Sequence, residues 1–290
     1  MGAPIPGRRA ASAHRRGATA HLLTGARYEL LPLPGTLDRA AALPPGSTVT
    51  VTASPNRGVE ATVSLTEALS RTGFRAVPHL AARQLTDRAE LAGVLDRLDA
   101  AGVRDVFVVG GDAREPAGEF PDGLALLTAM AELRHPMTDV GLPSYPEGHP
   151  LIDDDRLWAA LRDKQSHATY TVTQLCFDAD TVCAFAAAAR ARGIGLPIVV
   201  GVPGAVDIGR LLRMSLRVGA GDSVRFLRSH RSIAGKLLRP NGYRPDGLVR
   251  RLGAHVAAGR CRPAGLHLYT FNQVESTLRW VQQARRRAAS

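Results

Sequence analysis

The chain has 290 residues and a mass of 30.8 kDa; 45% of its residues are hydrophobic, 22% are charged, and its mean hydropathy is −0.06. These values are typical of a globular chain with a sizeable core, so they exclude fibrous and wholly disordered proteins. No run approaches the roughly 20 apolar residues of a membrane-spanning helix, and the arginine-containing start lacks the apolar segment of a signal peptide. We therefore expect a cytoplasmic protein with no membrane partner.

The net charge of +11 raises the question of a nucleic-acid partner, and the position of the charge bears on it. Residues 1–20 and 279–290 contain eight arginines and no acidic residue, so they supply +8 of the net charge of +11. We predict a disordered, flexible basic tail over 1–20, a catalytic barrel domain over 21–290, and no specific nucleic-acid partner. Weak, salt-sensitive binding of polyanions by the two ends is the open alternative. The arginines are Arg8, Arg9, Arg15, Arg16, Arg279, Arg285, Arg286 and Arg287.

Segments rich in β-forming residues alternate with helical patterns along the chain. Glycine, proline or asparagine bounds the strands, and apolar residues recur at spacings of three and four in the helices. Eight strands interleaved with helices predict a single (β/α)8 TIM barrel, because a doubly wound sheet of this length more often has five or six strands. The predicted strands span residues 27–33, 47–54, 75–82, 105–112, 137–145, 170–177, 196–202 and 265–271. The predicted helices span 87–100, 123–133, 154–168, 179–191 and 274–287, and more than one helix must fit within 206–259.

Residue types that form disulfides or bind metals occur without the usual patterns. Cys176, Cys183 and Cys261 are odd in number, widely spaced and form no CxxC pair, so we expect reduced, buried thiols. No HExxH motif or His/Asp cluster accompanies His79 and His149, so we expect hydrogen-bonding histidines and no metal. The spacings of GxGxxG, GxSxG and GxxxxGK[ST] are also absent, which disfavours a Rossmann domain, a hydrolase and a kinase.

Polar residues at the predicted strand ends are the candidate site, because catalytic residues of such barrels gather there. Glu29 interrupts an apolar strand, where burial favours a general acid; a glutamate paired with an arginine at the strand edge is the alternative. Asp112 follows two glycines and is placed to bond the N–H groups of a ring, but a turn-forming aspartate is the commoner explanation of this pattern. The full set is Glu29, Thr52, His79, Asp112, Tyr145, Gln174 and Tyr269.

Seven segments at these strand ends resemble motifs of the methylenetetrahydrofolate reductase family. Each segment is weak evidence alone, but all seven occur in family order from about residue 27 to the end of the chain. They are YELLP (28–32), VTVTAS (49–54), PHL (78–80), VFVVGGD (106–112), SYPEGHP (144–150), TQLCFD (173–178) and GLHLYTFN (265–272).

The resemblance implies reduction of 5,10-methylenetetrahydrofolate to 5-methyltetrahydrofolate, ordinarily by hydride transfer from a reduced nicotinamide to FAD and then to the folate. Glu29 matches the acid that protonates the bridging nitrogen, so that the bridge opens to an iminium on N5. Asp112 matches the carboxylate beside the pterin and flavin rings, Gln174 matches the amide that bonds the pterin, and Tyr269 joins the substrate-binding set. The positions that match the flavin side, and are assigned here to the cofactor, are Thr52, His79, Tyr145, His149 and Lys164.

The chain departs from the family where FAD is held. Gly110 stands in place of a common arginine, Leu157 and Ala160 replace an aspartate and an asparagine, and the bulky Trp158 lies beside them. The aromatic residue expected after the seventh strand is missing from residues 202–209. Some actinobacterial members work without flavin, so the resemblance implies an NAD(P)H-dependent reductase, with NADH as the expected cofactor and little or no FAD. A conventional FAD-dependent reductase and a non-catalytic folate-binding barrel are the alternatives.

Overall fold

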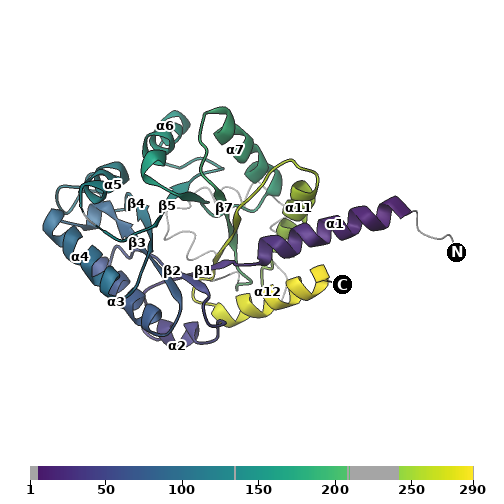
Figure 1. The fold of residues 1–290 in the computed structure, drawn as a ribbon, viewed down its shortest axis with the longest axis horizontal. Helices are drawn as coiled ribbons and strands as arrows, with labels where there is room; N and C mark the ends of the chain where they lie inside the picture. Colours follow the sequence, from purple (N-terminus) through teal and green to yellow (C-terminus); the bar gives the residue numbers. More distant parts are fainter. Residues whose placement is uncertain (1–5, 134, 208, 210–241, 290) are drawn as a thin grey trace.

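The computed structural model describes residues 6–133, 135–207, 209 and 242–289. Eight parallel strands close into a barrel in sequence order, surrounded by helices, which confirms the predicted TIM barrel (Figure 1). The strands are β1 (Arg27–Leu30), β2 (Thr48–Val51), β3 (Arg75–Ala81), β4 (Asp105–Val109), β5 (Asp139–Ser144), β6 (Tyr170–Thr173), β7 (Ile198–Pro203) and β8 (Gly265–Tyr269). The helices described are α1 (Pro6–Leu23), α2 (Thr36–Ala40), α3 (Gly58–Arg71), α4 (Arg88–Ala100), α5 (Gly123–Glu132), α6 (Asp154–Lys164), α7 (Ala179–Ala191), α11 (Asp246–Ala257) and α12 (Val274–Ala289), with 3-10 turns at Ala82–Gln84 and Gln165–His167.

The pairing of β1 on both sides closes the barrel. Tyr28 on this strand lies opposite Val49 of β2 and Leu268 of β8. All eight predicted strands are present, but the observed strands are mostly shorter, because the predicted ranges include the polar residues that follow them. Of the helices expected within residues 206–259, α11 is present, and residues 210–241 lie outside the described part of the chain.

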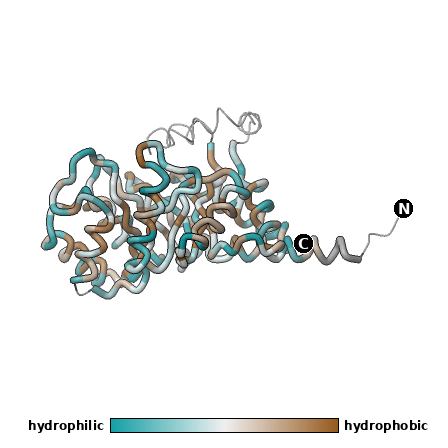
Figure 2. The backbone as a smooth tube through the Cα atoms, turned by 90° about the horizontal axis from the view of Figure 1, so that it is seen from above, coloured by the Kyte–Doolittle hydropathy of each residue, from teal (hydrophilic) through white to brown (hydrophobic). Residues whose placement is uncertain are grey.

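Among the residues that the structure describes, two clusters of apolar side chains make up the core. The larger joins the strands to the surrounding helices, and the smaller consists of strand residues that alternation turns toward the barrel interior. Glycine at 141 makes room for this interior, because a Cβ there would lie 2.5 Å from the Phe107 ring and 2.4 Å from that of Tyr170. Hydrophobic segments run mainly through the body of the molecule, with hydrophilic ones at its periphery (Figure 2). The interior cluster comprises Val77, Phe107, Tyr170, Val172 and Val199.

Aspartates begin four of the outer helices. Asp87, Asp122, Asp153 and Asp178 precede α4, α5, α6 and α7, and each side chain accepts a hydrogen bond from a backbone N–H of the first turn. Such caps satisfy N–H groups that have no partner within the helix, and each contributes about 1 kcal/mol. Among the helices described, none is long and apolar enough to cross a membrane.

A flexible tail was expected over residues 1–20; residues 6–20 are helical, and residues 1–5 lie outside the described part of the chain. Helix α1 begins at Pro6 and packs against α11 and α12, so residue 20 falls inside a helix rather than at a domain boundary (Figure 1). Leu22 and Leu23 are buried at its C-terminal end, and Gly253 of α11 allows a close approach, since a Cβ there would lie 2.1 Å from the hydroxyl of Thr19. The alanine-rich sequence favours the helix, and its small side chains fit the contact.

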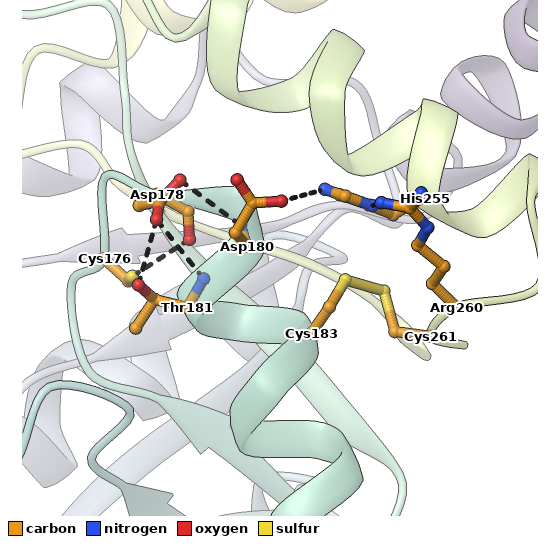
Figure 3. The surroundings of a disulfide bond; sticks show 8 residues. All are labelled: Cys176, Asp178, Asp180, Thr181, Cys183, His255, Arg260 and Cys261. Atoms are coloured by element: carbon orange, nitrogen blue, oxygen red, sulfur yellow. Dashed lines mark hydrogen bonds and ion pairs between the residues drawn. A yellow bond between two sulfur atoms is a disulfide. The ribbon is translucent and has the colours of Figure 1, made fainter.

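A disulfide between Cys183 and Cys261 corrects the expectation of three reduced thiols. It joins α7 to the segment that precedes β8, and the two Cα atoms are 5.3 Å apart although 78 positions separate them in the sequence (Figure 3). Beside it, Asp180 of α7 pairs with His255 of α11. Cys176 is a free, buried cysteine as predicted, and burial raises the pKa of its thiol.

A half-buried acid lies among the residues that begin the strands, at the N-terminal end of the barrel. Asp105 accepts hydrogen bonds from Arg27 at 3.0 Å and from the Tyr170 hydroxyl at 2.8 Å. Burial raises the pKa of Asp105 from 3.8 to about 6, and the charge of Arg27 opposes this shift. The free energy of unfolding therefore depends on pH through the carboxyl group of Asp105.

We expect wild-type stability to fall, relative to an Asp105→Asn variant, as the pH rises from about 4 to about 6.5. The folded-state pKa lies above the unfolded value, so the folded protein binds the proton more tightly; this contribution is complete below pH 4 and is lost as the pH rises through 6. The shift sets an upper bound of about 3 kcal/mol, and partial exposure reduces the effect to about 1–2 kcal/mol. Urea unfolding across this range measures it, and parallel curves for the two proteins would contradict it.

Candidate active site

Three side chains from strands far apart in the sequence meet at the C-terminal mouth of the barrel. The Glu29 carboxylate on β1 lies 3.0 Å from Nε2 of His267 on β8 and 3.9 Å from Nε2 of His79 on β3. Its side chain is only 13% exposed, and Thr270 donates a hydrogen bond to the Glu29 carbonyl at 2.5 Å. The partners of Glu29 in the described residues are thus histidines, rather than the arginine of the alternative interpretation.

The environment keeps His79 neutral. Burial lowers the pKa of His79 to about 4, and the nearby Glu29 carboxylate only partly opposes this shift. The imidazole packs at a tilt against the Phe107 ring, with a centroid distance of 4.6 Å, where the apolar barrel interior gives way to the polar mouth. At neutral pH, Glu29 therefore faces an uncharged imidazole on the β3 side.

His267 is a site residue that the sequence analysis missed. It lies two residues before Tyr269 on β8, and such residues share one face of a strand, so the alternation pattern is the signal that could have indicated it. Its hydrogen-bond partner Glu29 is 238 positions away in the sequence. Asn272 was also missed: it has a left-handed backbone, and its amide bonds the carbonyl of Leu31 at 3.1 Å, which ties the end of β8 to the end of β1.

Tyr269, Tyr145 and Asp112 continue the site around the mouth. The Tyr269 hydroxyl donates to the Thr173 carbonyl at 3.1 Å. Burial raises the pKa of Tyr269, and the charge of Glu29 adds to the shift. Burial likewise raises the pKa of Tyr145, with a contribution from the Asp112 carboxylate. The predicted residues on β1, β4, β5 and β8 therefore interact electrostatically.

Thr52 and Gln174 lie at two other strand ends. The backbone N–H of Thr52 donates to the Leu30 carbonyl at 2.9 Å, which places it beside the strand of Glu29. The Gln174 side-chain oxygen accepts a hydrogen bond from the Leu175 N–H at 2.7 Å, so its amide nitrogen is the group that remains for a ligand. The structure shows no direct contact between either side chain and Glu29.

A cleft between β5 and α6 is lined by two of the predicted cofactor residues, Tyr145 and Lys164, and His149 lies beside Tyr145. Burial lowers the pKa of Lys164, while Asp122 and Asp163 oppose the shift. The ring of His149 packs edge-on against that of Tyr145 at 5.2 Å. The lining includes Tyr145, Asp154, Leu157, Trp158, Ala160, Lys164 and Phe185.

Aromatic stacking fills one side of this cleft. The Trp158 indole stacks on Phe185 of α7, with centroids 4.9 Å apart and planes within 19°. The guanidinium of Arg192 lies 4.6 Å from the same indole ring. Leu157 and Ala160 offer no hydrogen-bonding side chain in the cleft. Trp158, Phe185, Leu157 and Ala160 therefore offer no hydrogen-bond acceptor to the ribose of FAD, and the polar side chains that line the cleft are those of Ser144, Tyr145, Asp154 and Lys164.

The fold and the site define a TIM barrel with a glutamate–histidine pair at its catalytic end and a mixed polar and aromatic cleft beside it. In the part of the chain that the structure describes, no group of three His, Cys, Asp or Glu residues is arranged to hold a metal ion. The family model described as methylenetetrahydrofolate reductase matches residues 32–224. The chain therefore belongs to the methylenetetrahydrofolate reductase family.

A curated relative is methylenetetrahydrofolate reductase (NADH) 1 of Arabidopsis thaliana, which is 26% identical over 209 residues. The match covers 63% of this chain and 34% of that protein, so it spans about a third of the relative's length.

Solved structures with a related chain path include tryptophan synthase from M. tuberculosis, with a TM-score of 0.46, 15% identity, and coverage of 94% of this chain and 96% of that one. Another is a putative lyase/mutase from Burkholderia cenocepacia J2315, with a TM-score of 0.42, 17% identity, and coverage of 80% and 98%. Neither similarity bears on function.

Proposed function

We propose that the protein reduces 5,10-methylenetetrahydrofolate to 5-methyltetrahydrofolate with NADH, by direct hydride transfer and without bound flavin. Family membership and the NADH named for the Arabidopsis relative support the reaction and the reductant. The observation that carries the proposal is the Glu29 carboxyl group, held 3.0 Å from His267 at the barrel mouth. Reduction of the bridge needs a proton donor there.

The chemistry needs one proton and one hydride. Glu29 gives its proton to the bridging nitrogen N10, the C–N10 bond breaks, and the electron pair of that bond stays on nitrogen. The resulting iminium carbon accepts a hydride from C4 of the nicotinamide, which forms the methyl group and leaves NAD⁺. The iminium accepts hydride directly, so the protein needs only to align two carbons, exclude water and supply the proton. Solvent then reprotonates Glu29.

The remaining polar residues divide between the two ligands. Asp112 and the Gln174 amide bond the pterin, and Tyr269 lies between this region and Glu29. Thr52, His79, Tyr145, His149 and Lys164 hold the dinucleotide, with Lys164 placed to meet its negative charge. The Trp158–Phe185 stack lies on the side of the cleft where the family resemblance places the adenosine end of FAD, so it opposes FAD in that pose. NADH also carries an adenosine, so we expect its adenosine end to lie outside this side of the cleft.

An NADH-oxidation assay tests the proposed function. Purified protein with 5,10-methylenetetrahydrofolate is expected to oxidise NADH and form 5-methyltetrahydrofolate in equal amounts, and added FAD is expected to leave the rate unchanged. Activity that appears only with FAD would support the conventional mechanism. Folate binding without NADH oxidation would indicate a non-catalytic folate-binding barrel.

Removing either pterin contact is expected to weaken folate binding. Gln174→Ala and Asp112→Ala should each cost about 1–3 kcal/mol of affinity, because each leaves a polar group of the pterin buried without its partner. Calorimetric titration with 5-methyltetrahydrofolate measures the loss, and NADH affinity serves as the control. Unchanged folate affinity in both variants would show that the pterin does not lie over β4 and β6.

A further inference from the structure

The loop that carries Asp112 is held by one arginine from the neighbouring loop. Residues 110–122 connect β4 to α5, and Arg83 lies in the turn that follows β3. Its guanidinium donates to three carbonyls of the loop: from Nε to Pro121 at 2.7 Å, and from one terminal nitrogen to Ala113 at 2.9 Å and to Arg114 at 3.3 Å. One side chain thus bonds the loop near both of its ends.

The Arg83 backbone adds two further hydrogen bonds. Its N–H donates to the Gly110 carbonyl, and its carbonyl accepts from the Ala117 N–H, both at 3.0 Å. Gly111 has a φ of +93°, and a Cβ there would lie 3.3 Å from the Ala81 Cβ and 3.5 Å from the Arg83 Cβ. The loop therefore lies directly against the backbone of the preceding turn.

Asp112 sits between two residues that Arg83 holds. The residue before it, Gly111, packs against Arg83, and the carbonyl of the residue after it, Ala113, accepts a hydrogen bond from the Arg83 side chain. Further along the loop, the Glu119 N–H donates to the Thr86 carbonyl at 2.8 Å. A site residue on a loop needs such support, because a loop without regular structure does not itself hold a side chain in place.

We propose that Arg83 is a positioning residue that holds Asp112 in its folate-binding orientation. The inference rests on the proposed function, in which Asp112 bonds the pterin. Arg83 acts through the loop backbone and does not itself touch the folate. A planar guanidinium with several fixed donors suits three carbonyls that lie in different directions, whereas a lysine ammonium is a compact point charge on a flexible stem.

A double-mutant cycle separates positioning from general stabilisation. Arg83→Met is expected to raise the Kd of 5-methyltetrahydrofolate by about 10-fold and to leave the Kd of NADH within about two-fold. In an Asp112→Asn background, the same change is expected to raise the folate Kd by less than about two-fold, since the contact that Arg83 positions is already lost. Arg83→Lys should lose nearly as much affinity as Arg83→Met, and it serves as the second variant if the methionine variant does not fold.

Arg97→Met is the matched control. Arg97 also holds two partners from a neighbouring element, because it bonds Glu67 at 2.8 Å and Glu60 at 2.6 Å, but these partners lie on α3, away from the barrel mouth. This variant is expected to lower the melting temperature and leave folate affinity unchanged in both backgrounds.

The outcomes distinguish the two hypotheses. Equal folate losses from Arg83→Met in the wild-type and Asp112→Asn backgrounds, or no loss in either, would overturn the positioning role. A wild-type protein that binds no 5-methyltetrahydrofolate would overturn the proposed function, on which the inference rests. Wild-type binding together with independent effects of the two residues would overturn the inference alone.

Discussion

Glu29→Gln is expected to lower turnover by about 100-fold or more, the usual scale of general acid catalysis, while leaving folding and ligand binding intact. Glutamine has the shape of glutamate and keeps a hydrogen-bonding group 3.0 Å from His267, but it has no proton to give to N10. Steady-state NADH oxidation gives the turnover, and titration with each ligand gives the affinity.

The surroundings of Glu29 bear on which side chain could replace it as the proton donor. The other acid–base side chain within 4 Å on the β3 side, His79, has a pKa lowered to about 4 and is neutral across the assay range, so it does not replace the lost proton. Glu115→Gln, on the exposed part of the β4–α5 loop, is the matched control and should keep full activity. Turnover close to that of the wild type in Glu29→Gln would remove Glu29 from the mechanism.

The second prediction with a large expected effect concerns the route by which the hydride reaches the folate. We expect a colourless protein, active with NADH alone, that transfers deuterium from stereospecifically labelled NADH to the product methyl group without loss to solvent. Direct transfer never places the label on an exchangeable atom, whereas a reduced flavin carries it on N5, where it exchanges with water. Mass spectrometry of the 5-methyltetrahydrofolate measures the retained label.

The cleft beside α6 is the structural reason for this expectation. Trp158 stacks on Phe185 at 4.9 Å, and Leu157 and Ala160 lack the polar groups that would bond a ribose. Charge-assisted hydrogen bonds contribute about 1–3 kcal/mol each, so we expect the absence of several of them to lower FAD occupancy by orders of magnitude. Stoichiometric flavin in the purified protein, or label lost to solvent, would restore the two-step mechanism. A conventional flavin-containing reductase of the family, assayed in parallel, is the control for label exchange.

Local patterns were sufficient to predict the architecture. Alternating and continuous apolar runs, bounded by glycine and proline, predicted all eight strands, and the regular interleaving with helices predicted a closed barrel. The same strand ends carried the motifs that indicated the family and the polar residues Glu29, Asp112, Tyr145 and Tyr269. These features depend on residues that are close together in the sequence, so they can be predicted directly from it.

Contacts between distant segments were not predictable in this way. The sequence predicted separate, reduced thiols for Cys183 and Cys261. Barrel closure instead brings α7 beside the segment before β8 and allows the disulfide. The arginine-rich N-terminal segment was predicted to be a flexible tail. Helix α1 instead packs on α11 through small residues, which give no strong hydrophobic pattern in the sequence.

The sequence by itself therefore determined the fold class and the family, and it supplied most of the residues that we propose for the site. Only the tertiary structure decided how those members pair: that Glu29 contacts His267 across 238 positions, that Arg83 holds the Asp112 loop, and that Trp158 stacks on Phe185. Strand and helix periodicity specifies which face a side chain occupies. It does not specify which distant side chain shares that face, because the partner depends on strand order, register and the closure of the barrel.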